Sequence, residues 1–251
     1  MIRTIALSLL VSLAFSITTS TASAQPAKKI PILLDFDIGD DIDDTFALAT
    51  VLASPELELR GVTTVGEDTY KRAQMTCRFL EAIGARVPVA AGLPEVTKRP
   101  LPYWQVEYGN HASVYFRDPK PLSEKKKVLQ DGKEKTVSAP LPAHEFIYRQ
   151  LKANPGELTI LAIGPLSNIA ALLEKHPDCK PMIKRIVIMG GSVRRGYNEG
   201  SKPQAEYNIV QDVKAAQAVF RSGVPLVVAP LDATAMLNLD AKRQKKLFDA
   251  G

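Results

Sequence analysis

The sequence predicts an α/β fold in which a mostly parallel sheet is covered by helices on both faces. Short apolar runs of strand type alternate along the chain with segments that carry apolar residues at helical spacing. Strands separated by helices of this length are joined by right-handed crossovers, so neighbouring strands run parallel. The 251 residues, 45% hydrophobic and 24% charged, suffice to bury one large core.

The predicted elements follow one another from residue 30 onward. Residues 30–36 (IPILLDF) predict a strand, and Asp43 to Ala53 predict a helix with acidic residues in its first turn. Residues 68–84 predict a helix that Asp68 or Thr69 can cap and Gly84 can end. The other expected strands lie at 59–65, 86–92, 158–164, 185–191 and 224–230, and the other expected helices at 144–153, after Pro165 and at 213–221.

The first 24 residues have the pattern of a secretory signal peptide. Arg3 precedes an apolar stretch that reaches about Ile17, and small residues lead to Ala24. The apolar stretch is shorter than the roughly 20 residues that a membrane-spanning helix needs. We therefore expect cleavage after Ala24 and export of residues 25–251 as one domain to the periplasm or the medium, with no membrane attachment after processing.

Composition argues against a redox centre and against binding of a nucleic-acid polymer. Cys77 lies in an apolar helical pattern, where a buried free thiol is the commoner outcome, and we expect Cys77 and Cys179 to remain unpaired. The formal net charge is +5, and the basic clusters lack interleaved aromatic residues. These clusters predict a solvated loop at residues 125–135 and a solvated helix end at residues 242–246.

Acidic residues gather where the first predicted strand ends. The ten residues from 35 to 44 contain Asp35, Asp37, Asp40, Asp41, Asp43 and Asp44. This is the edge of a parallel sheet where ligands bind, and crowded carboxylates need a cation, a proton or hydrogen bonds to offset their repulsion. Helix capping accounts for Asp43 and Asp44 but not for Asp35 and Asp37. Oxygen ligands without Cys or His favour a hard cation such as Ca²⁺ or Mg²⁺.

Further polar groups are expected at the same sheet edge. Gly164, Met189 and Asp232 lie at the ends of three other predicted strands. Amide and carboxylate groups suited to sugar hydroxyls occur between the last two of these strands, at Asn198, Glu206 and Asn208. The insertion before residue 120 carries aromatic residues that could stack on a base, namely Tyr103, Trp104 and Tyr108. It also carries His111, which could act as an acid.

These segments carry a family resemblance. The stretch DFDIG at residues 35–39, continued by Asp43 and Asp44, resembles the N-terminal D-x-D…D-D signature of the inosine/uridine-preferring nucleoside hydrolases. Four more segments resemble that family's later motifs in the same order: AIGPLSNIA, IVIMGGSV, AEYNIVQDVKAAQAVF and VAPLDAT. The resemblance extends from about Lys29 to Leu239.

The resemblance implies hydrolysis of the N-glycosidic bond of ribonucleosides to free base and ribose, by a water that Ca²⁺ activates. Asp37 would be the catalytic base and a metal ligand, Asp44 a second metal carboxylate, and Ile163 would give its main-chain carbonyl to the metal. Asp35 would act indirectly, by orienting its neighbours. The implied substrate-binding residues are Asp43, Asp68, Met189, Asn198, Glu206 and Asn208. The partner is a small-molecule nucleoside, and both the base preference and homo-oligomerisation stay open.

The sequence also departs from the family pattern. Two extra residues separate Asp37 from Asp43, and the family's C-terminal His-Asp pair has no counterpart before Gly251. We therefore expect a domain that is short at its C-terminus. Two alternatives remain: a relative with weakened catalysis that binds ribose or nucleosides, and a D-x-D phosphatase of haloacid-dehalogenase type, in which Asp35 would attack phosphorus.

Overall fold

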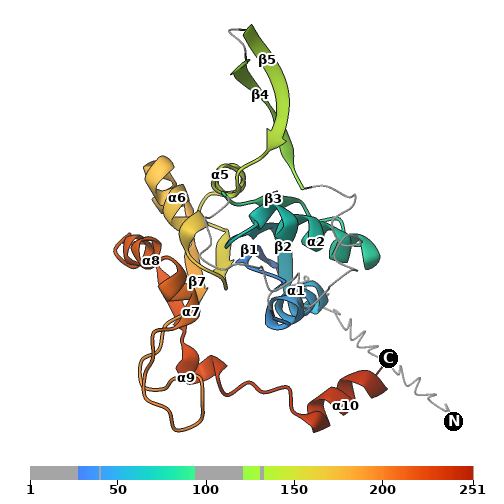
Figure 1. Ribbon diagram of the computed structural model, residues 1–251, viewed down its shortest axis with the longest axis vertical. Coiled ribbons are helices and arrows are strands. Elements are labelled where there is room, and N and C mark those ends of the chain that lie inside the picture. Colours follow the sequence, from blue (N-terminus) through green and yellow to red (C-terminus); the bar gives the residue numbers. More distant parts are fainter. Residues whose placement is uncertain (1–27, 40, 94–120, 131–132, 251) are drawn as a thin grey trace, which may run out of the picture.

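The computed structural model describes residues 28–39, 41–93, 121–130 and 133–250. A six-stranded sheet lies at its centre (Figure 1). The strand order is β3-β2-β1-β6-β7-β8, and each neighbouring pair is parallel. The strands are β1 (Ile30–Phe36), β2 (Leu57–Thr64), β3 (Val89–Ala91), β6 (Thr159–Ala162), β7 (Arg185–Met189) and β8 (Leu226–Ala229). The predicted parallel α/β class is confirmed.

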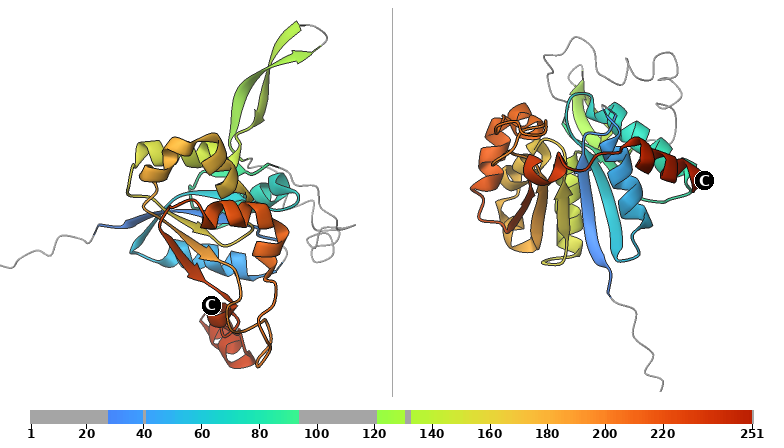
Figure 2. Two further views of the ribbon diagram at one scale, coloured as in Figure 1. Left: turned by 90° about the vertical axis from the view of Figure 1, so that its left-hand side faces the viewer. Right: turned by 90° about the horizontal axis from the view of Figure 1, so that it is seen from below.

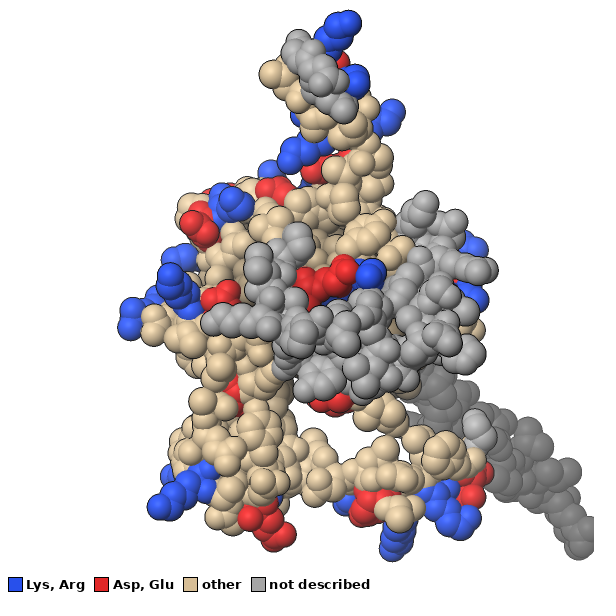
Figure 3. Space-filling view, in the orientation of Figure 1, with Lys and Arg blue, Asp and Glu red and all other residues tan. Residues whose placement is uncertain are grey.

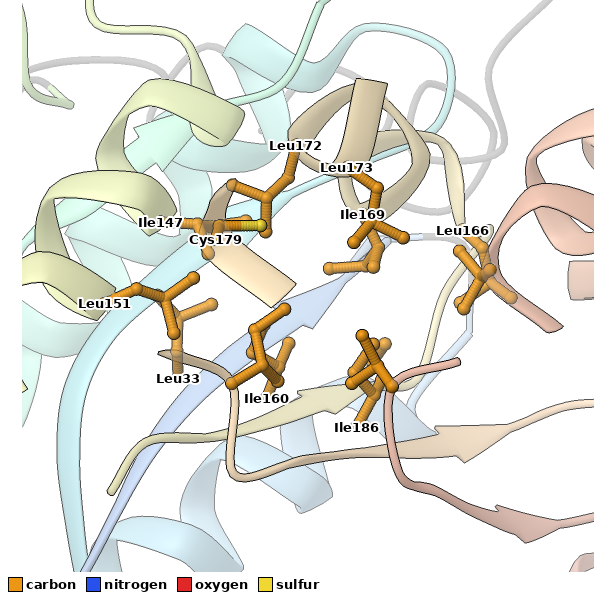
Figure 4. Close-up of a cluster of buried hydrophobic side chains, with 14 of the residues drawn as sticks. Leu33, Ile147, Leu151, Ile160, Leu166, Ile169, Leu172, Leu173, Cys179 and Ile186 are labelled. Carbon is orange, nitrogen blue, oxygen red and sulfur yellow. The ribbon is translucent and has the colours of Figure 1, made fainter. Parts of the chain in front are cut away.

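Helices cover both faces of this sheet, as predicted (Figures 1 and 2). Side chains alternate between the two faces along β1. Leu33 therefore packs in one buried cluster with residues of α5 and α6, while Leu34 packs in a second cluster with residues of α1 and α2. Figure 4 shows the first cluster, which includes Leu33, Ile147 and Ile160. The helices are α1 (Asp43–Ala53), α2 (Thr69–Ala82), α5 (Ala143–Ala153), α6 (Ser167–Lys175) and α8 (Val213–Phe220).

The order of the strands reverses between β1 and β6. From β1 the chain moves outward through β2 to β3, and from β6 it moves in the opposite direction through β7 to β8. The loops that follow β1 and β6 therefore diverge to opposite faces of the sheet. In open α/β sheets ligands bind at such a switch point, outside the carboxyl ends of the strands.

The segment around residues 125–135 has a different secondary structure from the predicted one. The basic residues expected in a loop form an antiparallel hairpin of β4 (Ser123–Gln130) and β5 (Lys133–Pro140). The hairpin stands away from the sheet (Figure 1). Basic side chains, which in β4 and β5 are lysines, follow its length (Figure 3). The predicted exposure is right and the predicted loop is wrong, because the two strands satisfy each other's backbone groups without needing a core.

Shorter elements complete the described chain. They are the 3₁₀ helix η2 (Pro177–Met182), and the helices α7 (Tyr207–Gln211), α9 (Leu231–Thr234) and α10 (Ala241–Asp249). None of the residues of α10 is buried, which confirms the expected solvated basic helix. None of the helices in the described ranges is long and apolar enough to cross a membrane.

Both cysteines are free and buried, as expected. Cys77 packs with the cluster that contains Leu34, whereas Cys179 packs with the cluster that contains Leu33. Burial raises the pKa of each thiol to about 11, so both remain protonated at neutral pH. The expected signal peptide, Asp40, and the aromatic insertion with His111 lie outside the described residues.

Candidate active site

Asp37 and Asp44 meet at the carboxyl end of β1. Asp37 directly follows the strand, and its backbone N–H donates to Asp44 Oδ2 at 2.9 Å. Asp44 is the second residue of α1 and is only 5% exposed. Asp37 lies between two glycines, since a Cβ on Gly164 would be 2.7 Å from Asp37 Oδ1 and one on Gly66 would be 3.5 Å from Asp37 Cβ. The Asp37 side chain therefore faces the switch point between β1 and β6.

Negative charge outweighs positive charge around Asp44. Burial raises the pKa of the Asp44 carboxyl well above its usual range, and the nearby carboxylates of Asp37, Asp43 and Asp41 raise it further. The Arg72 guanidinium opposes this rise without outweighing it. Bringing another cation to this group of carboxylates would therefore favour their charged forms.

Asp35 lies beneath this loop and is fully buried. Its Oδ1 accepts hydrogen bonds from Thr63 Oγ1 at 2.6 Å and from Asn168 Nδ2 at 2.8 Å. Asn168 also donates to the carbonyl of Thr64, so this network ties β1, β2 and α6 together. The phosphatase alternative requires Asp35 to reach a phosphorus atom, and a fully buried carboxylate in this network cannot do so.

Glu206 and Asn208 lie beyond β7, where α7 begins. Glu206 Oε1 accepts from the N–H of Asn208 at 3.0 Å, and Oε2 accepts from the N–H of Gly191 at 2.9 Å. Asn208 Nδ2 donates to the carbonyl of Ile163 at 2.9 Å and to that of Met189 at 3.3 Å. The ends of β6 and β7 are thus joined by side chains of α7. Ile163 precedes Gly164, so this group adjoins the Asp37 carboxylate.

Three predicted substrate-binding residues lie outside these contacts. Asp43 is exposed, and its Oδ1 accepts from the N–H of Asp44 at 2.8 Å. Asp68 is the N-cap of α2, where its carboxylate accepts from the N–H of Lys71 and pairs with the Lys71 ammonium at 3.4 Å. Asn198 is exposed in the loop between β7 and α7. Their substrate roles stay predictions.

Asp232, which the sequence places at the same edge, holds a loop. Its carboxylate accepts from the N–H groups of Val193 and Arg194, each at 2.9 Å. These bonds, with the Val193 bond contributing most, lower the pKa of the Asp232 carboxyl. The structure thus gives Asp232 a local role in shaping the loop that follows β7.

Sequence reasoning missed Arg72, the buried cation next to the acidic loop. Arg72 is 2% exposed, and its Nη1 donates to the carbonyls of both Asp37 and Ile38. The helical spacing could have predicted that Arg72 is buried, because Arg72 shares the buried face of α2 with Thr69, Ala73 and Thr76. A charged residue on an apolar helix face has to meet a partner inside the fold.

The fold and this site define a doubly wound α/β protein with an acidic, oxygen-rich site at its switch point. The family model described as inosine-uridine preferring nucleoside hydrolase matches residues 32–250, and the chain belongs to this family.

Individual relatives agree with this assignment. Over 212 residues the chain is 36% identical to the non-specific ribonucleoside hydrolase RihC of Shigella dysenteriae serotype 1, a match that covers 82% of this chain and 62% of that relative. Proteins of the same name from Escherichia coli match equally well. The chain thus spans less than two thirds of the length of these relatives.

Solved structures show the same fold. A purine-preferring ribonucleoside hydrolase from Gardnerella vaginalis matches with a TM-score of 0.65 and 27% identity, over 87% of this chain and 66% of that one. An inosine-uridine preferring nucleoside hydrolase from Bacillus anthracis matches with a TM-score of 0.64 and 23% identity, over 88% of this chain and 70% of that one. The second likeness supports the fold alone.

Proposed function

We propose that the protein hydrolyses the N-glycosidic bond of ribonucleosides, releasing free base and ribose. One observation carries this proposal: carboxylates from the loop after β1 adjoin a hydrogen-bonded group of amide, carboxylate and carbonyl oxygens from the ends of β6 and β7. Family membership and the names of the relatives support the same chemistry. A water nucleophile needs a base, and the ribosyl group needs partners for its hydroxyls.

The donor set at the loop suits a hard cation, and we propose Ca²⁺. Asp37 and Asp44 offer carboxylate oxygens and Ile163 offers its main-chain carbonyl, which are the ligands that Ca²⁺ prefers. The glycine at position 164 leaves space beside Asp37 Oδ1 that a side chain would fill. When bound, Ca²⁺ would lower the pKa of a coordinated water. Groups of three or more His, Cys, Asp or Glu with metal-site geometry are absent from the described residues, so backbone oxygens and water would have to complete the shell.

The protein side chains divide the remaining tasks. Asp37 takes the proton of the attacking water, which needs a carboxylate within hydrogen-bond reach of it. Glu206 is held by backbone N–H groups on both oxygens, and it can accept hydrogen bonds from ribose hydroxyls in a fixed direction. Asn208 is oriented by the Ile163 and Met189 carbonyls, and its Oδ1 can accept from a ribose hydroxyl. Fixing the sugar lowers the entropic part of the barrier.

The remaining elements of the proposal concern location and partners. We propose export to the periplasm or the medium because residues 1–24 have signal-peptide character. The partner is a small-molecule nucleoside. Asp43, Asp68 and Asn198 stay candidates for contacts with it.

Release of ribose from inosine and uridine tests the proposal directly. We expect ribose from both or one of these nucleosides, and no turnover of p-nitrophenyl phosphate. Asp37→Asn should lower ribose release by at least about 100-fold, the lower range for loss of a general base. Asp249→Asn removes a charge at the exposed end of α10 and should leave the rate unchanged. Nucleoside binding without ribose release would instead support the non-catalytic alternative.

A further inference from the structure

Arg72 connects two turns of backbone at the acidic loop, one at Asp37 and Ile38 and the other at Gly66 and Glu67. Its Nη1 donates to the carbonyl of Asp37 and, at 2.8 Å, to that of Ile38. Its Nε donates to the carbonyl of Gly66 at 3.0 Å, and its Nη2 lies 3.2 Å from Glu67 Oε2. A guanidinium presents its donors in one rigid plane, so these acceptors are fixed relative to one another.

Glu67, the ionic partner of Arg72, has an unusual backbone. Its φ of +52° is the only positive value at a non-glycine residue among the described residues. Such a conformation persists where the surroundings impose it and is concentrated at functional sites. The Glu67 side chain is 10% exposed and is paired with Arg72. The ion pair therefore forms within the turn that brings Gly66 against Asp37.

Both peptide groups of Asp37 are consequently held. On one side its N–H donates to Asp44 Oδ2, and on the other side its carbonyl accepts from Arg72. The side chain between them is bounded by Gly66, whose carbonyl Arg72 also holds, and by Gly164. With the backbone fixed at both ends, little freedom remains for the direction of the Asp37 carboxylate.

We propose that Arg72, with Glu67 as its counterion, is a positioning residue that sets the direction of the Asp37 carboxylate. This role rests on the proposed function, because Asp37 is the base of that reaction. The Arg72 side chain is 1% exposed, so in this role it would contact neither the nucleoside nor the water. It acts through the Asp37 carbonyl and the Gly66 turn, so its loss should lower the rate of the chemical step more than it weakens nucleoside binding.

The test compares Arg72→Lys, Glu67→Gln and the control Arg78→Lys in the full chain. Lysine keeps the charge but cannot hold three carbonyls in one plane. Arg78 lies on the same helix with an exposed side chain that pairs with Glu81, so the control makes the same substitution away from the loop. We expect Arg72→Lys to lower kcat for ribose release by about 10- to 100-fold, as for other groups that orient a reacting residue. KM for the nucleoside should stay within about twofold of wild type, and Glu67→Gln should have a smaller effect in the same direction.

Amide hydrogen exchange gives a second readout that does not depend on activity. Exchange should become faster in residues 37–39 and 65–67 of Arg72→Lys, with β6 and β7 unchanged, because only the loop loses its tether. If wild-type protein releases no ribose, the proposed function fails, and the exchange pattern alone still decides whether Arg72 holds the loop.

Three results would overturn the positioning role. The first is an unchanged kcat in Arg72→Lys, and the second is a uniform rise of exchange over the whole sheet, which would mark a general loss of stability. If Arg72→Lys does not fold, Glu67→Gln is measured in its place. The third overturning result is a Glu67→Gln protein in which both kcat and the exchange rates of residues 65–67 are unchanged.

Discussion

At the scale of single residues, Gly164 leaves no room for a side chain of its own beside Asp37. A Cβ on Gly164 would lie 2.7 Å from Asp37 Oδ1 and 3.1 Å from Asp37 N. Gly164→Ala should therefore push the carboxylate aside and lower ribose release by about 100-fold, the cost of misplacing a reacting group by about 1 Å. Steady-state kinetics with inosine measures this effect.

Gly190→Ala is the matched control for that substitution. Its Cβ would meet Ile209 Cδ1 at 3.3 Å and Glu206 Oε2 at 3.4 Å. The end of the isoleucine side chain can move by a few tenths of an ångström, so the rate should fall much less than in Gly164→Ala. Equal losses in the two variants would mean that the contact with Asp37 is not what matters.

A second single residue, His144, should make the free energy of unfolding depend on pH. The structure buries His144 on α5 at 5% exposure, because this helix packs on the sheet. Burial lowers the pKa of His144 below its usual 6.5, Glu145 opposes this, and Lys175 and His176 add to it.

The sign of the resulting pH dependence follows from linkage. Well above pH 6.5 the histidine is neutral in both states and contributes nothing. Below that pH the unfolded chain takes up a proton that the folded chain does not, so the free energy of unfolding falls until the pH passes the lowered folded pKa. His144→Gln should flatten this fall, as measured by urea unfolding at several values between pH 7.5 and 5. Parallel pH profiles for the two proteins would show that His144 is not responsible.

At the scale of elements, the sequence predicted those helices and strands whose boundary residues and apolar spacing indicate the same secondary structure. The strand at 30–36 and the helix at 43–53 match β1 and α1 residue for residue, since an apolar run and an acidic first turn mark their bounds. Of the two predicted caps of α2, Asp68 is the one that the structure has, and Gly84 adopts a positive φ of 69° just beyond the helix.

The remaining features depend on partners that are distant in sequence. The hairpin was missed because lysines dominate its composition, and only the pairing of β4 with β5 makes it a ribbon. Arg72 and Asn168 were missed for a related reason: their acceptors lie far away in the sequence, at Asp37 just after β1 and at Asp35 within β1. The local spacing of apolar residues predicts which face of a helix is buried, but it does not predict which loop that face contacts.

The hairpin should be dispensable for folding. Its base is closed by the bond from the N–H of Leu141 to the carbonyl of Leu122 at 2.9 Å, and its charged pairs, such as Lys127 with Glu134, are exposed. Replacing residues 124–139 with a short Gly-Ser turn should change the free energy of unfolding by less than about 1 kcal/mol, because exposed ion pairs contribute little.

Urea unfolding measures this change, and Leu141→Ala provides the contrast. Leu141 is buried at the foot of the hairpin, and its truncation should cost about 2 to 5 kcal/mol. A loss of that size on removing the hairpin itself would show that β4 and β5 stabilise the sheet.

At the scale of the whole molecule, the site joins the two halves of the sheet. Asp37 and Asp44 belong to the half that continues through α1 and α2, while Ile163 and Asn208 belong to the half that continues through α6 and α8. The unfolded chain cannot present these oxygens together, because more than 100 residues separate the first from the last. A cation bound here would therefore bind the native state alone and stabilise the entire sheet.

Calcium should accordingly raise the midpoint of thermal unfolding, with a shift that grows as its concentration passes the dissociation constant. At about 100 times that constant the gain is about 2.7 kcal/mol. Differential scanning calorimetry over a calcium series, with a chelator as the zero point, measures the shift. Asp37→Asn should abolish it because a principal ligand is lost, whereas Asp249→Asn, at the exposed end of α10, should keep it in full. A full calcium shift in Asp37→Asn would mean that the cation binds elsewhere. The repulsion among Asp37, Asp43 and Asp44 would then be offset, among the described residues, by groups that include Arg72 and hydrogen bonds such as that from the Asp37 N–H.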